Sequence, residues 1–424
     1  MARTTTSAER LLTLFRDNVR RVHARGLSHM KIEDERLEAG LITLDGRRIH
    51  NFGDCSYLGL GTDPRLVAAA KDALDRFGTS YSSSIGYTAV PLYTDLKERL
   101  EALMGAAVAI APTTTLAHAG ALPVLVRPAD TVLMDSAVHN SVQMSAQLLR
   151  ANGVPVATVP HGDDETLERM LDEAMETSDG AVWYLADGVY SMSGSVAPFA
   201  RIVTQLERHP RLWAYVDDAH GFSWAGSHGS GVAVAEMGWH DRLVISAGLS
   251  KGFAGGGGIV ANPDPELMEY VQVCGPPMNF GGPIPPAALG ANVASADIHL
   301  SPEIDHLQAG VTARIDRVLD LTAELRIPMV ARDRTPIFFV EVGRTDVMIE
   351  VGSAMVADGF YLNPSAWPVV PHRRAGLRFT VTNSLEIDVI EMMLERLHHH
   401  LKVAGALERL VVDLRGDEPA IELR

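Results

Sequence analysis

The sequence is short of cysteine, of positive charge and of long apolar runs. Only two of its 424 residues are cysteines, Cys55 and Cys274, which excludes a disulfide framework and predicts a reducing, cytoplasmic location. The 53 acidic and 37 basic side chains give a formal net charge of −16, which argues against nucleic-acid and anionic-membrane partners. No apolar run approaches the roughly 20 residues of a membrane span, and the polar residues 1–6 lack a signal-peptide core.

The order of the apolar segments predicts the fold class. Between residues 51 and 290, short apolar strands such as 182–185 alternate with helical patterns. This alternation predicts an α/β domain whose mostly parallel sheet is covered by helices on both faces. A chain of this length is too long for one simple core. Residues 291–424 are therefore expected to form a smaller α+β domain, with one strand near 337–342.

Residues 1–50 predict an arm in front of the large domain. Apolar side chains recur at helical spacing from Leu11 to Val22, and residues 41–49 form the pattern of a hairpin around an Asp-Gly turn. Near the other end of the chain, residues 398–400 are three consecutive histidines. Because consecutive residues do not share one helix face, these histidines predict no metal site.

Lys251 is the most informative residue of the chain. It follows the apolar segment 244–249, with Ser250 before it and four consecutive glycines at 255–258. A partly desolvated amine becomes a nucleophile that can form a Schiff base, and small neighbours leave room for a bulky cofactor. Taken alone, the pattern is also that of a solvated surface lysine after a buried strand.

A second segment, residues 212–221, favours a cofactor-binding lysine over a surface lysine. An apolar run there ends in Asp217, Asp218 and His220. In open α/β sheets ligands bind beyond the carboxyl ends of the strands, so these side chains are expected to face a crevice. A buried carboxylate at such a place can keep the pyridine nitrogen of pyridoxal phosphate (PLP) protonated. The structural alternative is an aspartate that caps the following turn.

Several segments in one order resemble a known enzyme family. They are residues 51–60, 135–141, 187–198, 217–232, 250–251 and 376–380. Together they resemble the α-oxoamine synthases, which are PLP enzymes of aminotransferase fold type I. The resemblance implies a seven-stranded, mostly parallel sheet, PLP as cofactor and a homodimer with active sites at the subunit interface. It also implies an amino acid and an acyl thioester, or another electrophile, as substrates.

The resemblance assigns catalytic roles to four residues. It implies that Lys251 holds the cofactor and moves protons, and that Asp217 pairs with the ring nitrogen. His139 is expected to stack on the cofactor ring. His220 is expected to lie near the ring oxygen and the substrate, where it shares in acid/base work. The structural alternative for His139 is a histidine that hydrogen-bonds a loop, and for His220 it is a structural turn histidine.

The remaining site residues bind the cofactor or the substrate. The resemblance implies that Asp187 supports the stacking histidine and that Ser250 adjoins the cofactor lysine. Thr114 and Thr115 begin an apolar helical pattern, where backbone N–H groups and hydroxyls suit a phosphate. The substrate residues implied by the resemblance are Arg378, for the substrate carboxylate, Ser191 and Cys55. Simple turn or cap roles are the alternative for Asp187, Ser191 and the threonines, and a surface strand arginine is the alternative for Arg378.

The chain departs from the family mainly around the substrate. Cys55 stands where the family has asparagine, and residues 78–85 replace a glycine-rich run that carries an arginine. Thr113–Thr115 replaces a Ser-Gly-aromatic element, and Gly248 replaces a threonine. The cofactor residues are kept and the substrate residues are changed, a pattern that favours specialised biosynthesis.

The expected reaction is a decarboxylative condensation of an amino acid with an acyl thioester. Two alternatives stay open. The same cofactor also supports transamination, aldol-type chemistry, and replacement or annulation on a substrate such as S-adenosylmethionine. A non-catalytic partner subunit or a regulator is the third reading, although Lys251 is kept and the residues before Asn51 are too few for a DNA-binding module.

Overall fold

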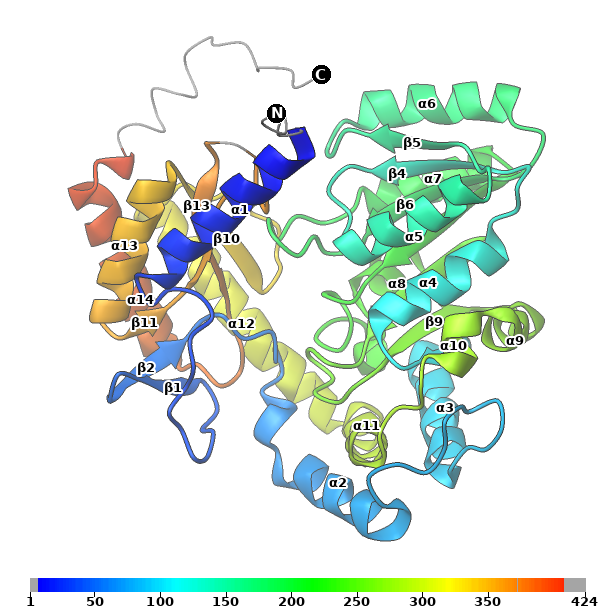
Figure 1. Cartoon of the computed structure of the whole chain (residues 1–424), viewed down its shortest axis with the longest axis horizontal. Helices are drawn as coiled ribbons and strands as arrows, with labels where there is room; N and C mark the ends of the chain where they lie inside the picture. The colour runs from blue at the N-terminus through cyan, green and yellow to red at the C-terminus, as the bar shows by residue number, and fades with distance from the viewer. Residues whose placement is uncertain (1–6, 372, 408–424) are drawn as a thin grey trace, which may run out of the picture. The chain divides into compact units, whose positions relative to one another are not determined.

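The computed structural model describes residues 7–371 and 373–407, which form two compact units (Figure 1). The first unit contains the described residues up to Cys55, the segment Met192–Gly194 and the described residues from Thr312 onward. The second unit contains Ser56–Ser191 and Ser195–Val311.

These bounds differ from the expected boundaries after residues 50 and 290. In the first unit, β2 (Arg47–Asn51) pairs with β11 (Phe360–Tyr361), so the N-terminal arm belongs with the C-terminal residues. In the second unit, α11 (Pro286–His299) packs against α2 (Pro64–Phe77), which carries this unit past residue 290. Neither contact leaves a composition signal at the boundary itself.

The second unit is built on a seven-stranded sheet. Its strand order is β3-β9-β8-β7-β6-β4-β5, and only β9 runs antiparallel to its neighbours. The strands are β3 (Ala107–Ala111), β4 (Thr131–Asp135), β5 (Val156–Val159), β6 (Val182–Asp187), β7 (Leu212–Asp217), β8 (Leu243–Gly248) and β9 (Gly258–Asn262). Every residue of β6 and β8 is buried, as expected for parallel strands covered on both faces. The predicted α/β class with a mostly parallel seven-stranded sheet is confirmed.

Helices cover this sheet. They are α2, α3 (Pro91–Met104), α4 (Thr114–Leu125), α5 (Asn140–Ala151), α6 (Asp164–Thr177), α7 (Phe199–Arg208), α8 (Val232–Met237), α9 (Pro265–Cys274), α10 (Pro276–Phe280), α11 and the start of α12 (Glu303–Glu324), with 3-10 turns at Leu60–Thr62 and Ser227–Gly229. Side chains of α4 and α5, such as Leu122 and Leu149, form one core with Leu185 and Val244 of the strands. Burying each such side chain contributes about 1.5–3 kcal/mol, which fixes α4 on the sheet.

The first unit contains two three-stranded sheets, β1-β2-β11 and β10-β13-β12. Its elements are α1 (Ser7–His23), β1 (Leu41–Leu44), β2, β10 (Ile337–Gly343), α13 (Thr345–Ala357), β11, β12 (Asn363–Ser365), β13 (Ala375–Thr380) and α14 (Ile387–Val403), besides the end of α12. The predicted hairpin is confirmed: Asp45 and Gly46 have φ angles of 48° and 69°, as a tight two-residue turn requires.

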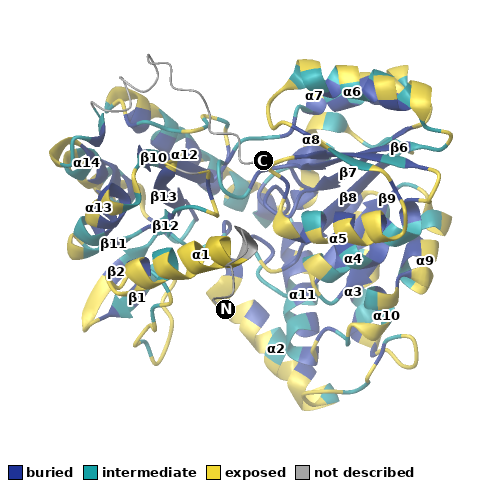
Figure 2. Ribbon diagram, turned by 45° about the horizontal axis from the view of Figure 1, so that its top comes forward, coloured by how far each residue is buried: buried dark blue, intermediate teal, exposed yellow. Residues whose placement is uncertain are grey.

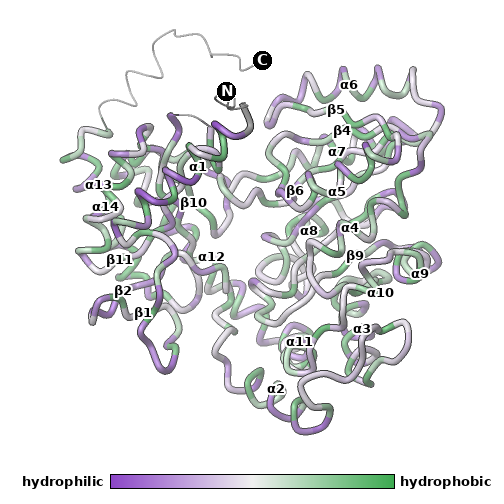
Figure 3. Tube along the Cα trace, in the orientation of Figure 1, coloured by the Kyte–Doolittle hydropathy of each residue, from purple (hydrophilic) through white to green (hydrophobic). Residues whose placement is uncertain are grey.

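Burial follows this architecture. Figure 2 shows the strands of the seven-stranded sheet as buried, while α6 and α1 expose much of their surface. Hydrophilic residues, drawn in purple, occur along α1 (Figure 3), and the sequence of this helix includes several arginines. Among the residues that the structure describes, no helix combines the length and the hydropathy needed to cross a membrane. The described residues also contain no cluster of three side chains suited to a metal ion.

Candidate active site

Three carboxylates lie at the ends of neighbouring parallel strands. Asp135, Asp187 and Asp217 are the last residues of β4, β6 and β7, and all three are buried. Asp187 and Asp217 are direct partners across the sheet, and Asp217 pairs with Ser246 of β8 on its other side. The carboxyl edge of the sheet therefore gathers the acidic groups that the sequence places far apart, at the position where α/β folds bind ligands.

Asp217 is held as a carboxylate. His118 places Nε2 3.0 Å from its Oδ2, and the N–H of Ala219 donates to its Oδ1 at 3.0 Å. Burial alone would raise the pKa of Asp217, but its charge interaction and hydrogen bond with His118, together with the charge of Lys251, bring the pKa below the ordinary value. A buried carboxylate that stays ionised is suited to pair with a cationic ligand group.

Two neighbouring carboxyl groups have raised pKa values instead. Burial, followed by repulsion from Asp217, raises the pKa of Asp187 well above its ordinary value. Burial raises the pKa of Asp218 to about 8. Environments that push the proton affinities of adjacent acids apart are a common feature of active sites.

Lys251 lies in the loop between β8 and β9 and is half-buried. Its charge lowers the pKa of Asp217 and of Asp187, so its amine lies within electrostatic reach of both carboxyl groups. Ser250, beside it, is exposed. The structure thus brings the lysine to the same edge of the sheet as the acidic groups.

His139 precedes α5 as its N-cap. The carboxylate of Asp187 accepts its backbone N–H at 2.9 Å, and its Nδ1 lies 2.6 Å from the Ser141 hydroxyl. Burial lowers the pKa of His139, which favours a neutral imidazole. A neutral, half-buried ring beside Asp217 and Lys251 is suited to lie against an aromatic ligand.

His220 is buried and has an aromatic partner that the sequence did not indicate. Its Nδ1 lies 2.7 Å from the Tyr57 hydroxyl, and its backbone oxygen accepts the indole N–H of Trp224 at 2.7 Å. The contact with Tyr57 orients the imidazole, and the bond from Trp224 holds the backbone of His220.

The start of α4 packs closely on the sheet. Thr113 caps the helix, because its hydroxyl accepts the N–H of Leu116 at 3.1 Å. A Cβ on Gly248 would lie 2.9 Å from Thr114 Oγ1, and one on Gly258 would lie 2.6 Å from Thr114 Cα. Glycine at both positions therefore allows the helix start, with the side chains of Thr114 and Thr115, to approach β8 and β9.

The predicted substrate residues are divided between the two units. Ser191 is half-buried in the second unit, in the loop after β6. Arg378 lies in β13 of the first unit, where it is 7% exposed, and its Nη2 lies 3.7 Å from the sulfur of Cys55. Arg378 and Cys55 thus share one environment within that unit.

Two side chains that contact the expected site residues were not predicted. His118 contacts Asp217, and Tyr57 contacts His220. His118 lies inside an apolar helical run, where a buried polar side chain indicates a specific partner. That indication identifies a residue of interest but not which partner it contacts.

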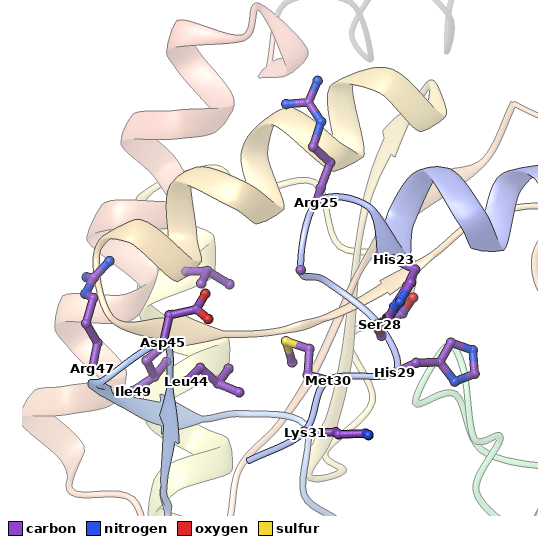
Figure 4. Close-up of a pocket in the computed structure, with 12 residues that line it drawn as sticks. His23, Arg25, Ser28, His29, Met30, Lys31, Leu44, Asp45, Arg47 and Ile49 are labelled. Atoms are coloured by element: carbon purple, nitrogen blue, oxygen red, sulfur yellow. Dashed lines mark hydrogen bonds between the residues drawn. The ribbon is translucent and has the colours of Figure 1, made fainter. Parts of the chain in front are cut away.

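The first unit contains a separate cavity of about 360 Å³ (Figure 4). Met30, Leu44 and Ile49 line it together with polar side chains, which include Arg25 and Arg47. Figure 4 shows both guanidinium groups extending toward the top of the view from separate segments, without converging on a shared centre. The carboxyl edge of the large sheet is the stronger candidate, because it gathers buried acidic groups with shifted pKa values beside a lysine.

Comparison with known proteins settles the family. The family model described as aminotransferase class I and II matches residues 48–397. The 8-amino-7-oxononanoate synthase of Azoarcus sp. (strain BH72) is 33% identical over 399 residues, which cover 92% of this chain and 98% of that protein. The chain belongs to the α-oxoamine synthases of the aminotransferase class I and II family. The serine palmitoyltransferase of Sphingobacterium spiritivorum is 26% identical, over 89% of this chain and 96% of that protein.

Solved structures support the fold of this α-oxoamine synthase. A serine palmitoyltransferase from S. paucimobilis superimposes with a TM-score of 0.84 at 19% identity, covering 94% of this chain and 99% of the other. The predicted fold type I architecture is confirmed by this likeness. The predicted family, enzyme class and cofactor are confirmed by the family match.

The residues of the α-oxoamine synthase fit PLP. The buried, ionised Asp217 is suited to the ring nitrogen, and the half-buried imidazole of His139 to a ring face. The helix start at Thr114 and Thr115 offers hydroxyls and N–H groups to a phosphate, and neither hydroxyl has a hydrogen-bond partner within the described ranges. Each part of the cofactor thus has a matching group on the carboxyl edge of one sheet.

Proposed function

We propose that this chain joins the α-carbon of an amino acid to the acyl group of a thioester, with loss of CO2, in specialised biosynthesis. The observation that carries the proposal is the ionised Asp217 beside Lys251 at the ends of β7 and β8. The relatives named 8-amino-7-oxononanoate synthase and serine palmitoyltransferase support it. When bound, PLP supplies an electron sink for negative charge at the amino acid's α-carbon.

Asp217 and Lys251 have complementary tasks in this proposal. Asp217 keeps a proton on the ring nitrogen, because its charge is stabilised without a bulk-water shell. The Lys251 amine anchors the cofactor and moves a proton at the substrate's α-carbon. The carboxyl groups of Asp187 and Asp218, whose pKa values are raised, do not compete as charged partners for that amine.

The two histidines differ in protonation and access. His139, whose pKa is lowered by burial, would lie against one face of the bound ring as a neutral imidazole and would exclude water from that face. His220, whose Nδ1 contacts the Tyr57 hydroxyl, would lie near the ring oxygen and the substrate, where its imidazole would share in acid/base work. Asp187 accepts the backbone N–H of His139 and so helps to position the imidazole of that histidine. Thr114 and Thr115 would bind the phosphate, and Ser250 adjoins Lys251.

Arg378, Cys55 and Ser191 bind the substrate in this proposal. The planar guanidinium of Arg378 suits two parallel hydrogen bonds to a carboxylate. Cys55, 3.7 Å from that guanidinium, offers a soft, weakly polar surface where an asparagine would offer a hydrogen bond. Such a pocket favours an amino acid or electrophile with more apolar bulk than glycine.

We also propose a cytoplasmic homodimer. Both cysteines are free thiols, which suits a reducing compartment. Helices α5, α9 and α10 each contact α4, and they expose a set of large apolar side chains between 46% and 67%: Met144, Leu148, Tyr270, Val273 and Phe280. Exposed apolar groups that gather on adjacent helices mark a protein interface. Val273→Asp with Phe280→Ser should convert the dimer to monomers in sedimentation velocity.

Product analysis tests the reaction. Purified protein with PLP is incubated with each amino acid, labelled with ¹³C at its carboxyl, and a panel of acyl-CoA thioesters. Release of labelled CO2 and free thiol in equal amounts supports condensation. Retention of the label in a keto acid identifies transamination, and loss of methylthioadenosine from S-adenosylmethionine identifies replacement or annulation. No reaction with any pair, in a protein that takes up no PLP, would favour a non-catalytic subunit.

A further inference from the structure

His118 connects two residues of β7 from the helix that faces it. It is fully buried in α4, with Nε2 3.0 Å from Asp217 Oδ2 and Nδ1 2.8 Å from the Tyr215 hydroxyl. An ionised carboxylate only accepts hydrogen bonds, so Nε2 carries the hydrogen that is donated to Asp217. In the neutral imidazole, Nδ1 then accepts the hydroxyl proton of Tyr215, and both ring nitrogens are satisfied.

The two oxygens of Asp217 are held by donors of different kinds. Oδ2 receives its hydrogen bond from the His118 side chain, whereas Oδ1 accepts the backbone N–H of Ala219 at 3.0 Å. His118 therefore influences both the rotation and the charge of the carboxylate. It belongs to the helix whose first turn contains Thr114 and Thr115, so one rigid element places both the phosphate donors and the group behind Asp217.

We propose that His118 is a positioning residue for PLP, which holds the Asp217 carboxylate charged and in one orientation so that the shared proton stays on the ring nitrogen. The inference rests on the proposed function, in which Asp217 faces that nitrogen. Without the His118 donor the buried carboxylate becomes the stronger base, and the proton moves from the nitrogen to the oxygen. The titratable groups around Asp217 are His118, His139, Asp187, Tyr215, Asp218 and Lys251.

The test measures the protonation state of the ring nitrogen. PLP labelled with ¹⁵N in its ring is bound to the wild-type protein and to His118→Asn, His118→Phe and Tyr215→Phe, and the ¹⁵N chemical shift is followed from pH 6 to pH 9. Loss of one hydrogen bond to a charged group should lower the proton affinity of the nitrogen about tenfold, which displaces its titration by about one pH unit. The displacement of the titration should be larger in His118→Phe than in His118→Asn. Tyr215→Phe should give a smaller displacement in the same direction.

His299 provides the matched control. It is also fully buried, but its ring contacts Ser223 and Ser295 instead of Asp217. His299→Asn should lower stability without moving the ¹⁵N titration. Identical titrations in wild type and His118→Asn would overturn the inference. If His118→Phe does not fold, the titrations of His118→Asn and Tyr215→Phe still test the inference. A wild-type protein that binds no PLP on Lys251 would instead refute the proposed function, and this inference with it.

Discussion

Asp218 is a buried acid whose charge state should control stability. It is fully buried, its Oδ2 accepts the N–H of Ala233 at 2.9 Å, and its Oδ1 has no hydrogen-bond partner among the described residues. Gly188, Gly221 and Gly231 pack their backbones against it, since a Cβ on any of them would lie 2.0–2.3 Å from a carboxylate oxygen. Burial raises the pKa of Asp218 from 3.8 to about 8.

The sign of the pH dependence follows from this shift. Because the folded pKa lies above the unfolded one, the folded chain binds a proton that the unfolded chain has released between pH 4 and pH 8. The stability contribution of the proton is complete at pH 4 and is lost as the pH rises toward 8. At about 1.4 kcal/mol per pH unit, keeping Asp218 protonated costs roughly 4 kcal/mol at pH 7.

Asp218→Asn removes this cost and keeps the shape. The amide leaves an unpaired N–H, which costs about 1–3 kcal/mol at every pH. The variant should therefore be near wild-type stability at pH 5 and about 2 kcal/mol more stable at pH 7, because the difference grows by about 3 kcal/mol over those two units. Urea unfolding followed by tryptophan fluorescence at pH 5, 6, 7 and 8 measures it.

The control is another buried aspartate with satisfied oxygens. Asp130 accepts N–H groups of Arg127, Ala181 and Trp183, so Asp130→Asn removes partners and should destabilise the protein at each pH. Parallel stability curves for wild type and Asp218→Asn between pH 5 and pH 8 would refute the reasoning.

Three further predictions concern the cofactor and the substrate. Borohydride reduction of the protein with PLP should leave the phosphopyridoxyl group on Lys251 in peptide mapping, and a different labelled lysine would contradict the assignment. Arg378→Lys should weaken amino-acid binding by about 1–3 kcal/mol, or 5- to 150-fold in Kd, with the absorbance of bound PLP unchanged; an unaltered Kd would remove Arg378 from the site. Gly248→Thr should lower PLP affinity, because its Cβ would meet Thr114 Oγ1 at 2.9 Å, and Thr114→Gly in the same chain should restore it; no recovery in a PLP titration would mean that the two positions do not exchange one hydroxyl.

The large sheet could be predicted because each of its strands has a recognisable local sequence pattern. Buried parallel strands are continuous apolar runs, and polar side chains at their ends converge wherever the sheet places them. Lys251 and Asp217 both follow or end such strands. The segments that carry them occur along the chain in the order of one enzyme family, and both that family and its fold are confirmed.

The contacts behind these residues could not be predicted in the same way. His118 and Asp217 are 99 positions apart, and Tyr57 and His220 are 163 apart, so each pair meets only through the packing of whole elements. The unit boundaries have a similar cause. The arm joins the C-terminal residues through β11, a strand of two residues whose pairing leaves no periodic signal.

The acids of the site differ in pKa, and this difference determines which of them is suited to carry charge. Three carboxyl groups, those of Asp187, Asp217 and Asp218, lie close enough to interact at one edge of the sheet. If all three were ionised, a single lysine could not balance them in a buried environment, and mutual repulsion would destabilise the fold. Of the three, Asp217 is the one to which a histidine donates, and it is the one whose pKa is lowered. The other two carboxyl groups have raised pKa values, so Asp217 is the one of these three that is best suited to carry the negative charge that a protonated ring nitrogen would face.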